Sequence, residues 1–252
     1  MKPLVLIAND DGYFSRSLKV LVEKFRKEYE VVVVAPDLNR SGVGRAVSLE
    51  MPIKVREIEQ NFYAVSGTPV DCMCFGLGAA LWKAPSLVVT GINIGANLGT
   101  DVLTSGTVCA AMEGYMRGIP SIAVSQDSEG TYERTADLAL DVAKRVIGKP
   151  PVLLNINTPS DHFKEVRWTK LGKRIYDYRV NKSVDPRGKA YYWIGGGKIV
   201  AVPGVDTDCQ AILDGAATIT PLQVDITEYE MLGDLMDKEK GVYDFGINES
   251  DD

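Results

Sequence analysis

Short apolar runs recur along this chain between longer polar or helical segments, and this spacing constrains the fold more than any other feature. The runs occupy residues 4–8, 31–35, 87–90, 121–125 and 152–156. A continuous apolar run of this length is typical of a strand that is covered on both faces. Strands that alternate with helices predict an α/β fold with a doubly wound, mainly parallel sheet and helices on both faces.

The segments between these runs carry helix signals. Apolar residues recur at helical spacing between Leu18 and Glu28. Thr68-Pro69 is typical of a helix start, with Thr as the N-cap and Pro at the first helical position. We also predict helices over about 105–116 and 136–147, and short strands at 47–56 and 62–65.

The pattern changes beyond about residue 161, where Tyr, Trp, Val and Gly crowd into short segments without a helical period. We therefore predict an α/β core at 1–160 and a β-rich C-terminal extension at 161–227 that returns to the core. Residues 228–252 form a predicted acidic tail. From Asp225 to Asp252 the chain has ten acidic and two basic residues, which is typical of a solvated terminus.

Composition excludes several classes of protein. The net charge of −6 disfavours general nucleic-acid binding. No stretch approaches the roughly 20 apolar residues of a membrane span, and the first run is too short for a signal peptide, so we expect a cytoplasmic protein. A single histidine disfavours zinc sites built on several histidines. The four cysteines form no paired framework and are expected to be small buried thiols.

Three polar loops leave predicted strands at the edge of the sheet where ligands bind in parallel α/β folds. The first carries Asn9-Asp10-Asp11-Gly12, the second spans 37–44 and includes Ser41, and the third spans 91–107. These loops hold small oxygen-bearing residues and no His or Cys. Such donors suit a hard cation such as Mg²⁺, Mn²⁺ or Ca²⁺ and suit zinc poorly.

Asp10 and Asp11 follow a buried strand directly, where two adjacent carboxylates repel each other and resist desolvation. A bound dication would remove both problems. The alternative is an exposed turn before a helix, where Asp is a good capping residue. The other two polar loops favour the metal-binding interpretation.

Ser105-Gly106-Thr107 opens a predicted helix, and it also has two interpretations. Hydroxyls, a glycine and free N–H groups at a helix start can hold a phosphate. The same tripeptide can be an ordinary N-cap. Beside a candidate metal loop, phosphate binding is the preferred hypothesis.

Eight ordered blocks make this sequence resemble the SurE family, stationary-phase survival proteins that are metal-dependent nucleotidases. They cover the chain to about residue 227, where Asp225 and Thr227 close the set. The blocks are Asn9-Asp10-Asp11-Gly12, Val34–Asp37 with Arg40-Ser41-Gly42, Gly67–Cys72, Gly91–Gly99, Ser105-Gly106-Thr107, Leu154–Asn157, Asp185–Gly188 and Thr220–Leu222.

The resemblance implies a Rossmann-like core and a C-terminal arm exchanged between subunits of a homodimer or homotetramer. It implies a phosphomonoesterase that hydrolyses nucleoside 5′- and 3′-monophosphates with one divalent ion per subunit, Mg²⁺ or Mn²⁺. By the same resemblance the catalytic residues would be Asp10, Asp11 and Asn97. The implied metal ligands are Asp10, Asp11, Ser41 and Asn93, and the implied phosphate-binding residues are Asn97, Ser105, Gly106 and Thr107.

Ala8, Ala96 and Thr104 depart from the family's usual residues at positions that are not ligands, so these departures bear on pocket shape and substrate preference. Attack by water and attack by one of the two aspartates both remain open, and Asp101 is a candidate general acid. A non-catalytic nucleotide-binding or sensing protein on the same fold is the alternative function. An NAD-type oxidoreductase is disfavoured, because Gly42-Val43-Gly44 lacks the third small residue of the dinucleotide fingerprint.

Overall fold

The computed structural model describes residues 2–79, 82–195, 199–202 and 204–239. The chain divides into two compact units, Met1–Leu222 and Gln223–Asp252. Within the second unit the structure contains one helix, α6 (Tyr229–Glu239). The described part of the predicted acidic tail at 228–252 consists of Glu228 and this helix, and the part from 240 to 252 lies outside the described residues.

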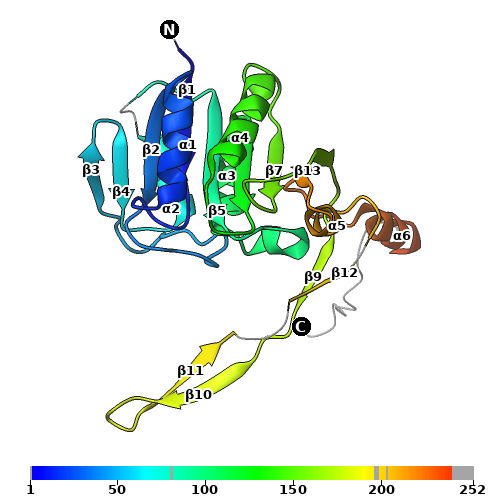
Figure 1. Ribbon diagram of the computed structural model, residues 1–252. Coiled ribbons are helices and arrows are strands. Elements are labelled where there is room, and N and C mark those ends of the chain that lie inside the picture. The colour runs from blue at the N-terminus through cyan, green and yellow to red at the C-terminus, as the bar shows by residue number, and fades with distance from the viewer. Residues whose placement is uncertain (1, 80–81, 196–198, 203, 240–252) are drawn as a thin grey trace, which may run out of the picture. The chain divides into compact units, whose positions relative to one another are not determined.

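A nine-stranded sheet forms the centre of the first unit, in the order β3-β4-β2-β1-β5-β6-β7-β13-β8 (Figure 1). All neighbours from β4 to β7 pair in parallel. The strand order reverses at β1, so the doubly wound, mainly parallel sheet is confirmed. The strands are β1 (Leu4–Ala8), β2 (Glu30–Pro36), β3 (Val55–Glu59), β4 (Phe62–Val65), β5 (Leu87–Ile94), β6 (Ser121–Gln126), β7 (Leu153–Thr158), β8 (Val166–Trp168) and β13 (Ala217–Leu222).

Helices cover both faces of this sheet. One face carries α1 (Arg16–Arg26) and α4 (Glu133–Val146), and the other carries α2 (Pro69–Gly78) and α3 (Gly106–Met116) (Figure 1). Alternate side chains of β1 enter the two layers, because successive residues of a strand point to opposite faces. Val5 and Ile7 pack in the layer of α1, whereas Leu4 and Leu6 pack in the layer of α2.

One predicted strand is wrong. Residues 47–54 form no strand, and β3 begins only at Val55. Leu49 and Met51 are 88% and 74% exposed, so the apolar residues that suggested a strand have no sheet face to pack on. The segment is held instead by Ser48, whose backbone N–H and hydroxyl both donate to the carboxylate of Asp71.

The β-rich C-terminal extension is confirmed as additional strands after β7. β9 (Lys173–Tyr176) pairs antiparallel with β12 (Ile199–Val202), and β10 (Val180–Val184) pairs antiparallel with β11 (Ala190–Ile194). The chain then returns through α5 (Asp208–Leu213) to β13, which joins the main sheet beside β7. No helix in the described residues is long and apolar enough to cross a membrane.

Candidate active site

The three predicted loops meet at the carboxyl edge of the sheet. The backbone N–H of Arg40, in the loop after β2, donates to the carbonyl of Asp10, in the loop after β1, at 2.7 Å. The N–H of Gly44 donates to the carbonyl of Thr104, in the loop after β5, at 3.0 Å. These backbone bonds bring together segments that are far apart in sequence, next to the point where the strand order reverses.

Asp10 is 3% exposed and lies against the start of α3. The hydroxyl of Thr107 donates to Oδ1 of Asp10 at 2.5 Å, and the backbone N–H of Thr107 donates to Oδ2 at 3.3 Å. Burial raises the pKa of Asp10, and the two bonds from Thr107 act against this shift. Asp10 is therefore a fixed, strongly desolvated carboxyl group.

Asp11, the next residue in the loop after β1, is also buried, at 9% exposed. It accepts hydrogen bonds from the N–H of Ile94 at 3.3 Å and from the side-chain amide of Asn39 at 3.4 Å. Desolvation first, and the charge of Asp10 second, raise the pKa of Asp11 to about 6. Among the described residues neither carboxyl group has a cationic partner, and such an adjacent buried pair fits a divalent ion, whose charge would offset both effects.

Asn93 and Ser41 are the other two predicted ligands. Asn93 is buried at the end of β5, and its side-chain amide N–H donates to the carbonyl of Gly95 at 2.6 Å. Within the described part of the chain its Oδ1 accepts no hydrogen bond, which leaves an oxygen donor for a cation. Ser41 is exposed and follows Arg40, the residue that is bonded to the Asp10 carbonyl.

Glycines allow the loops to approach this closely. Gly91 has φ +132°, and a Cβ at this position would lie 2.2 Å from the carbonyl oxygen of Val124. The pairing of β5 with β6 shifts register between Thr90 and Asn93. A Cβ at Gly106 would lie 3.0 Å from the Cβ of Asp10. The small residues therefore set how near α3 and β6 come to the carboxylates.

The Ser105-Gly106-Thr107 segment starts α3 as predicted. Ser105 is the N-cap, and its hydroxyl oxygen accepts the N–H of Val108 at 3.1 Å. The Thr107 hydroxyl is directed to Asp10. The N-cap interpretation is thus correct for Ser105, and the helix N-terminus also lies beside the paired carboxylates, where it can attract an anion.

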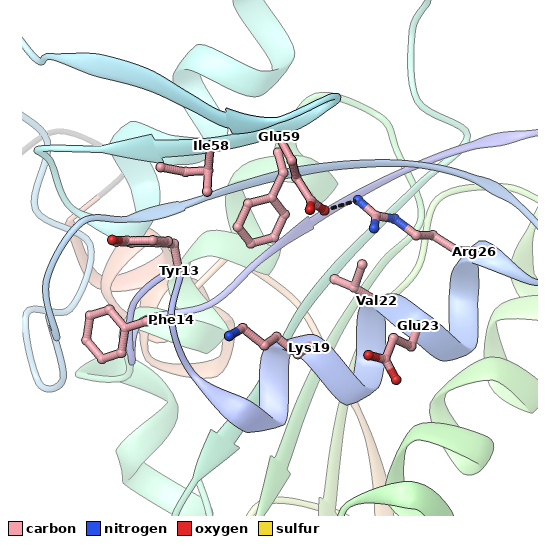
Figure 2. Close-up of a pocket in the computed structure, with 9 residues that line it drawn as sticks. Tyr13, Phe14, Lys19, Val22, Glu23, Arg26, Ile58 and Glu59 are labelled. Carbon is pink, nitrogen blue, oxygen red and sulfur yellow. Dashed lines mark hydrogen bonds and ion pairs between the residues drawn. The ribbon is translucent and has the colours of Figure 1, made fainter.

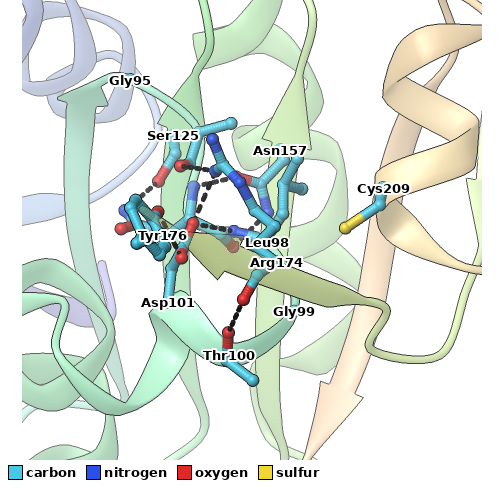
Figure 3. A network of polar contacts seen from close by, with 12 residues as sticks. Gly95, Leu98, Gly99, Thr100, Asp101, Ser125, Asn157, Arg174, Tyr176 and Cys209 are labelled. Atoms are coloured by element: carbon cyan, nitrogen blue, oxygen red, sulfur yellow. Dashed lines mark hydrogen bonds and ion pairs between the residues drawn. The ribbon is translucent and has the colours of Figure 1, made fainter. Parts of the chain in front are cut away.

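Buried polar residues on β6 and β7 hold Asn97, and Figure 3 labels two of them, Ser125 and Asn157. Its backbone N–H donates to Oδ1 of Asn157 at 2.8 Å, and its carbonyl accepts the side-chain amides of Asn155 and Asn157. Its own side-chain amide donates to the hydroxyl of Ser125 at 2.8 Å. Sequence reasoning gave Asn155 and Asn157 no role. The signal that could have found them is the pair of asparagines in an otherwise apolar strand.

Asp101, the candidate general acid, is engaged on both of its carboxylate oxygens. Its Oδ2 accepts the guanidinium of Arg174 at 2.5 Å, and its Oδ1 accepts the hydroxyl of Tyr176 at 2.5 Å. The N–H of Leu98 adds a third donor at 3.3 Å. Asp101 therefore links the loop after β5 to β9 and serves as an anchor between them.

A separate cavity of about 330 Å³ lies between α1 and the β3–β4 hairpin (Figure 2). Val22 and Phe62 supply apolar lining, and the ion pair between Arg26 and Glu59 crosses one end at 3.0 Å. Its lining includes none of the predicted metal or phosphate residues. The cavity is therefore distinct from the candidate active site.

The fold and the clustered oxygen donors define a Rossmann-like α/β protein with a candidate cation and phosphate site at the sheet's carboxyl edge. The family model for "Survival protein SurE" matches residues 5–178, and the chain belongs to the SurE family.

Relatives with curated names cover nearly the whole chain. A 5′-nucleotidase SurE from Vibrio vulnificus (strain CMCP6) is 44% identical over 239 residues, which is 92% of this chain and 94% of the relative. A 5′-nucleotidase SurE from Aquifex aeolicus (strain VF5) is 42% identical over 240 residues, covering 91% and 96%. A crystal structure of the SurE protein from Aquifex aeolicus superposes with a TM-score of 0.79 at 41% identity, covering 94% of this chain and all of that one.

Proposed function

We propose that this protein is a 5′-nucleotidase that hydrolyses nucleoside monophosphates to nucleoside and phosphate. Membership of the SurE family and the names of the curated relatives support this activity. The observation that carries it in the chain itself is the buried pair Asp10 and Asp11 beside the N-terminus of α3. Carboxylates beside a helix N-terminus combine a place for a cation with a place for an anion.

We further propose one divalent ion per subunit, Mg²⁺ or Mn²⁺, held by Asp10, Asp11, Ser41 and Asn93. Carboxylate, amide and hydroxyl oxygens are the donors that these ions prefer. When bound, such an ion supplies charge neutralisation and a more acidic water for phosphoryl transfer. The fit rests on the burial of the two aspartates, which raises the pKa of both, and on the free amide oxygen of Asn93 within the described residues.

The phosphate group is proposed to lie between Asn97 and the Ser105–Thr107 segment. A side-chain amide carries two N–H donors. Asn97 gives one of them to Ser125, so the second can reach an oxygen of the substrate. Ser105 uses its hydroxyl oxygen as an acceptor for Val108 and keeps its O–H for donation. Phosphoryl transfer needs chiefly such positioning and charge neutralisation, and the same contacts would accept 5′- and 3′-monophosphates.

Phosphate release tests this function. Asp10→Asn and Asn93→Ala should each abolish divalent-dependent phosphate release from nucleoside monophosphates while the circular dichroism spectrum stays unchanged. Asp137→Asn is the matched control, because Asp137 is a surface carboxylate paired with Lys24. Saturable nucleotide binding without phosphate release in the presence of Mg²⁺, Mn²⁺, Co²⁺ or Ca²⁺ would contradict the proposal and support the non-catalytic alternative.

We also propose that the extension at 161–227 is an arm exchanged between the subunits of a homodimer or homotetramer. Large apolar side chains on its β10–β11 hairpin are exposed in the single chain, including Val180, Tyr192, Trp193 and Ile194. Val180, Tyr192 and Ile194 share one face of the hairpin and Trp193 lies on the other, and exposed apolar patches are typical of interaction sites. Trp193→Glu should lower the mass measured by light scattering, whereas Lys182→Glu on the same hairpin should not; an unchanged mass for both variants would contradict the arm interface.

A further inference from the structure

Side chains of β9, near the start of the extension, hold the loop that carries Asn97 in place. The guanidinium Nη1 of Arg174, on β9, donates to the carbonyl of Ala96 at 3.1 Å and to Oδ2 of Asp101 at 2.5 Å (Figure 3). These two acceptors lie on either side of Asn97 in the sequence. One side chain therefore fixes the peptide that immediately precedes Asn97 and the turn that follows it.

Two further hydrogen bonds between β9 and this loop reinforce the contacts of Arg174. The hydroxyl of Tyr176 donates to Oδ1 of Asp101, and the hydroxyl of Thr100 donates to the carbonyl of Arg174 at 2.9 Å. The side chains of Arg174 and Asp101 are only 14% and 8% exposed. Water therefore competes weakly for this ion pair, and the guanidinium is held in one orientation.

The opposite side of Asn97 is equally constrained. Asn155 and Asn157 on β7 hold its backbone carbonyl and N–H. The loop is thus enclosed between β7 and β9, and the side-chain amide of Asn97 has little freedom to turn. A side chain that donates to a substrate oxygen must be held in position by its neighbours, because displacing it by about 1 Å can lower the rate about 100-fold.

We propose that Arg174 is a positioning residue for phosphate release. It holds the peptide between Ala96 and Asn97 so that the Asn97 amide faces the substrate phosphate, and it acts without touching the substrate itself. This inference rests on the proposed nucleotidase function and on the place of Asn97 in it. It links the rate of phosphate release to β9, a strand of the extension that is remote in sequence from all three loops.

Steady-state kinetics of the full-length protein with a nucleoside monophosphate and saturating Mn²⁺ test the inference. Arg174→Ala should lower kcat by about 10- to 100-fold, while the Kd for Mn²⁺, measured by electron paramagnetic resonance, stays unchanged. Arg174→Lys keeps the charge and should restore part of the rate. Arg179→Ala is the matched control, because Arg179 is an exposed arginine close by on the same extension, paired only with Asp177 within the described residues.

Tyr176→Phe keeps the ion pair between Arg174 and Asp101 and removes one donor to Asp101. It therefore tests the contacts between β9 and the Asn97 loop if Arg174→Ala does not fold. It should lower kcat with an unchanged melting temperature and an unchanged Kd for Mn²⁺. An unchanged kcat in Tyr176→Phe together with a wild-type kcat in Arg174→Gln, which removes the charged guanidinium, would overturn the proposal.

A double-mutant cycle separates positioning from a general structural effect. In the Asn97→Ala background, Arg174→Ala should cost almost nothing further, because the group that it positions is already gone. An equal loss in both backgrounds would overturn the positioning role. If the wild-type protein releases no phosphate at all, the proposed function fails; if the wild type is active and Arg174→Ala is unaffected, only this inference fails.

Discussion

The hydroxyl of Thr107 donates to Oδ1 of Asp10 at 2.5 Å, and the two residues are separated by 97 positions in the sequence. The backbone N–H of Thr107 reaches the other oxygen of the same carboxylate. The first turn of α3 therefore orients a proposed metal ligand. Loss of a partner that orients a ligand in this way typically costs about 10- to 100-fold in metal affinity.

Thr107→Val should weaken Mn²⁺ binding by about 10- to 100-fold, because the valine has the same shape but leaves Asp10 without its hydroxyl donor. Isothermal titration calorimetry of the metal-free protein measures this affinity. Thr107→Ser retains the hydroxyl and should bind nearly as tightly as the wild type. Equal affinities for the valine and serine variants would show that the bond does not orient the ligand.

Gly106→Ala should disturb the same carboxylate by crowding it. The added Cβ would lie 3.0 Å from the Cβ of Asp10, 3.1 Å from its Oδ2 and 3.0 Å from Cγ of Pro69. Since alanine favours the helix, we expect the free energy of unfolding to change by less than about 1 kcal/mol, while the Kd for Mn²⁺ rises about tenfold. Gly78→Ala, where a Cβ meets no atom within 4 Å, should leave the Kd unchanged. A wild-type Kd in Gly106→Ala would contradict this account.

The raised pKa of Asp11 predicts how the metal-free protein responds to pH. The pKa of Asp11 rises from its ordinary value of 3.8 to about 6 in the folded chain, so the folded state binds more protons than the unfolded state between these two pH values. Its free energy of unfolding should therefore fall as the pH rises through this window, by about 3 kcal/mol in total. Urea titrations of chelator-treated protein at pH 4.5 and pH 7 measure the change.

Asp11→Asn isolates the contribution of this residue from that of other carboxyl groups. The variant should lose the part of the pH dependence that Asp11 contributes, and adding Mg²⁺ to the wild type at pH 7 should restore stability by mass action. A wild type and a variant with the same pH dependence would show that Asp11 titrates in the folded chain as it does in the unfolded one.

Much of the fold could be predicted because it follows from local patterns. The apolar runs became β1, β2, β5, β6 and β7, and loops that follow parallel strands share one edge, so Asp10 and Thr107 could be expected near each other. The segment at 47–54 misled because its apolar side chains are exposed, and alternation alone does not show which residues find a partner.

The partners of the Asn97 loop could not be predicted for a different reason. Arg174 contacts Asp101 only because the extension folds back along the loop after β5, and no local pattern encodes such a distant return. The buried asparagines of β7 were visible in the sequence, but their bonds to Asn97 depend on the order of the strands. Sequence could therefore suggest the proposed ligands, whereas the residues that hold them required the structure.

Gly91→Ala should be among the most destabilising single changes in the chain. Gly91 has φ +132°, which L side chains rarely adopt, and its new Cβ would lie 2.2 Å from the backbone oxygen of Val124. That oxygen belongs to β6, which pairs on both sides with β5 and β7, so it cannot move aside cheaply. We expect a loss of about 4 kcal/mol or more in urea denaturation, against less than about 1 kcal/mol for Gly78→Ala. Near-wild-type stability of Gly91→Ala would mean that β5 and β6 are further apart at this point than the structure places them, and the position of Asn93 at the end of β5 would then have to be revised as well.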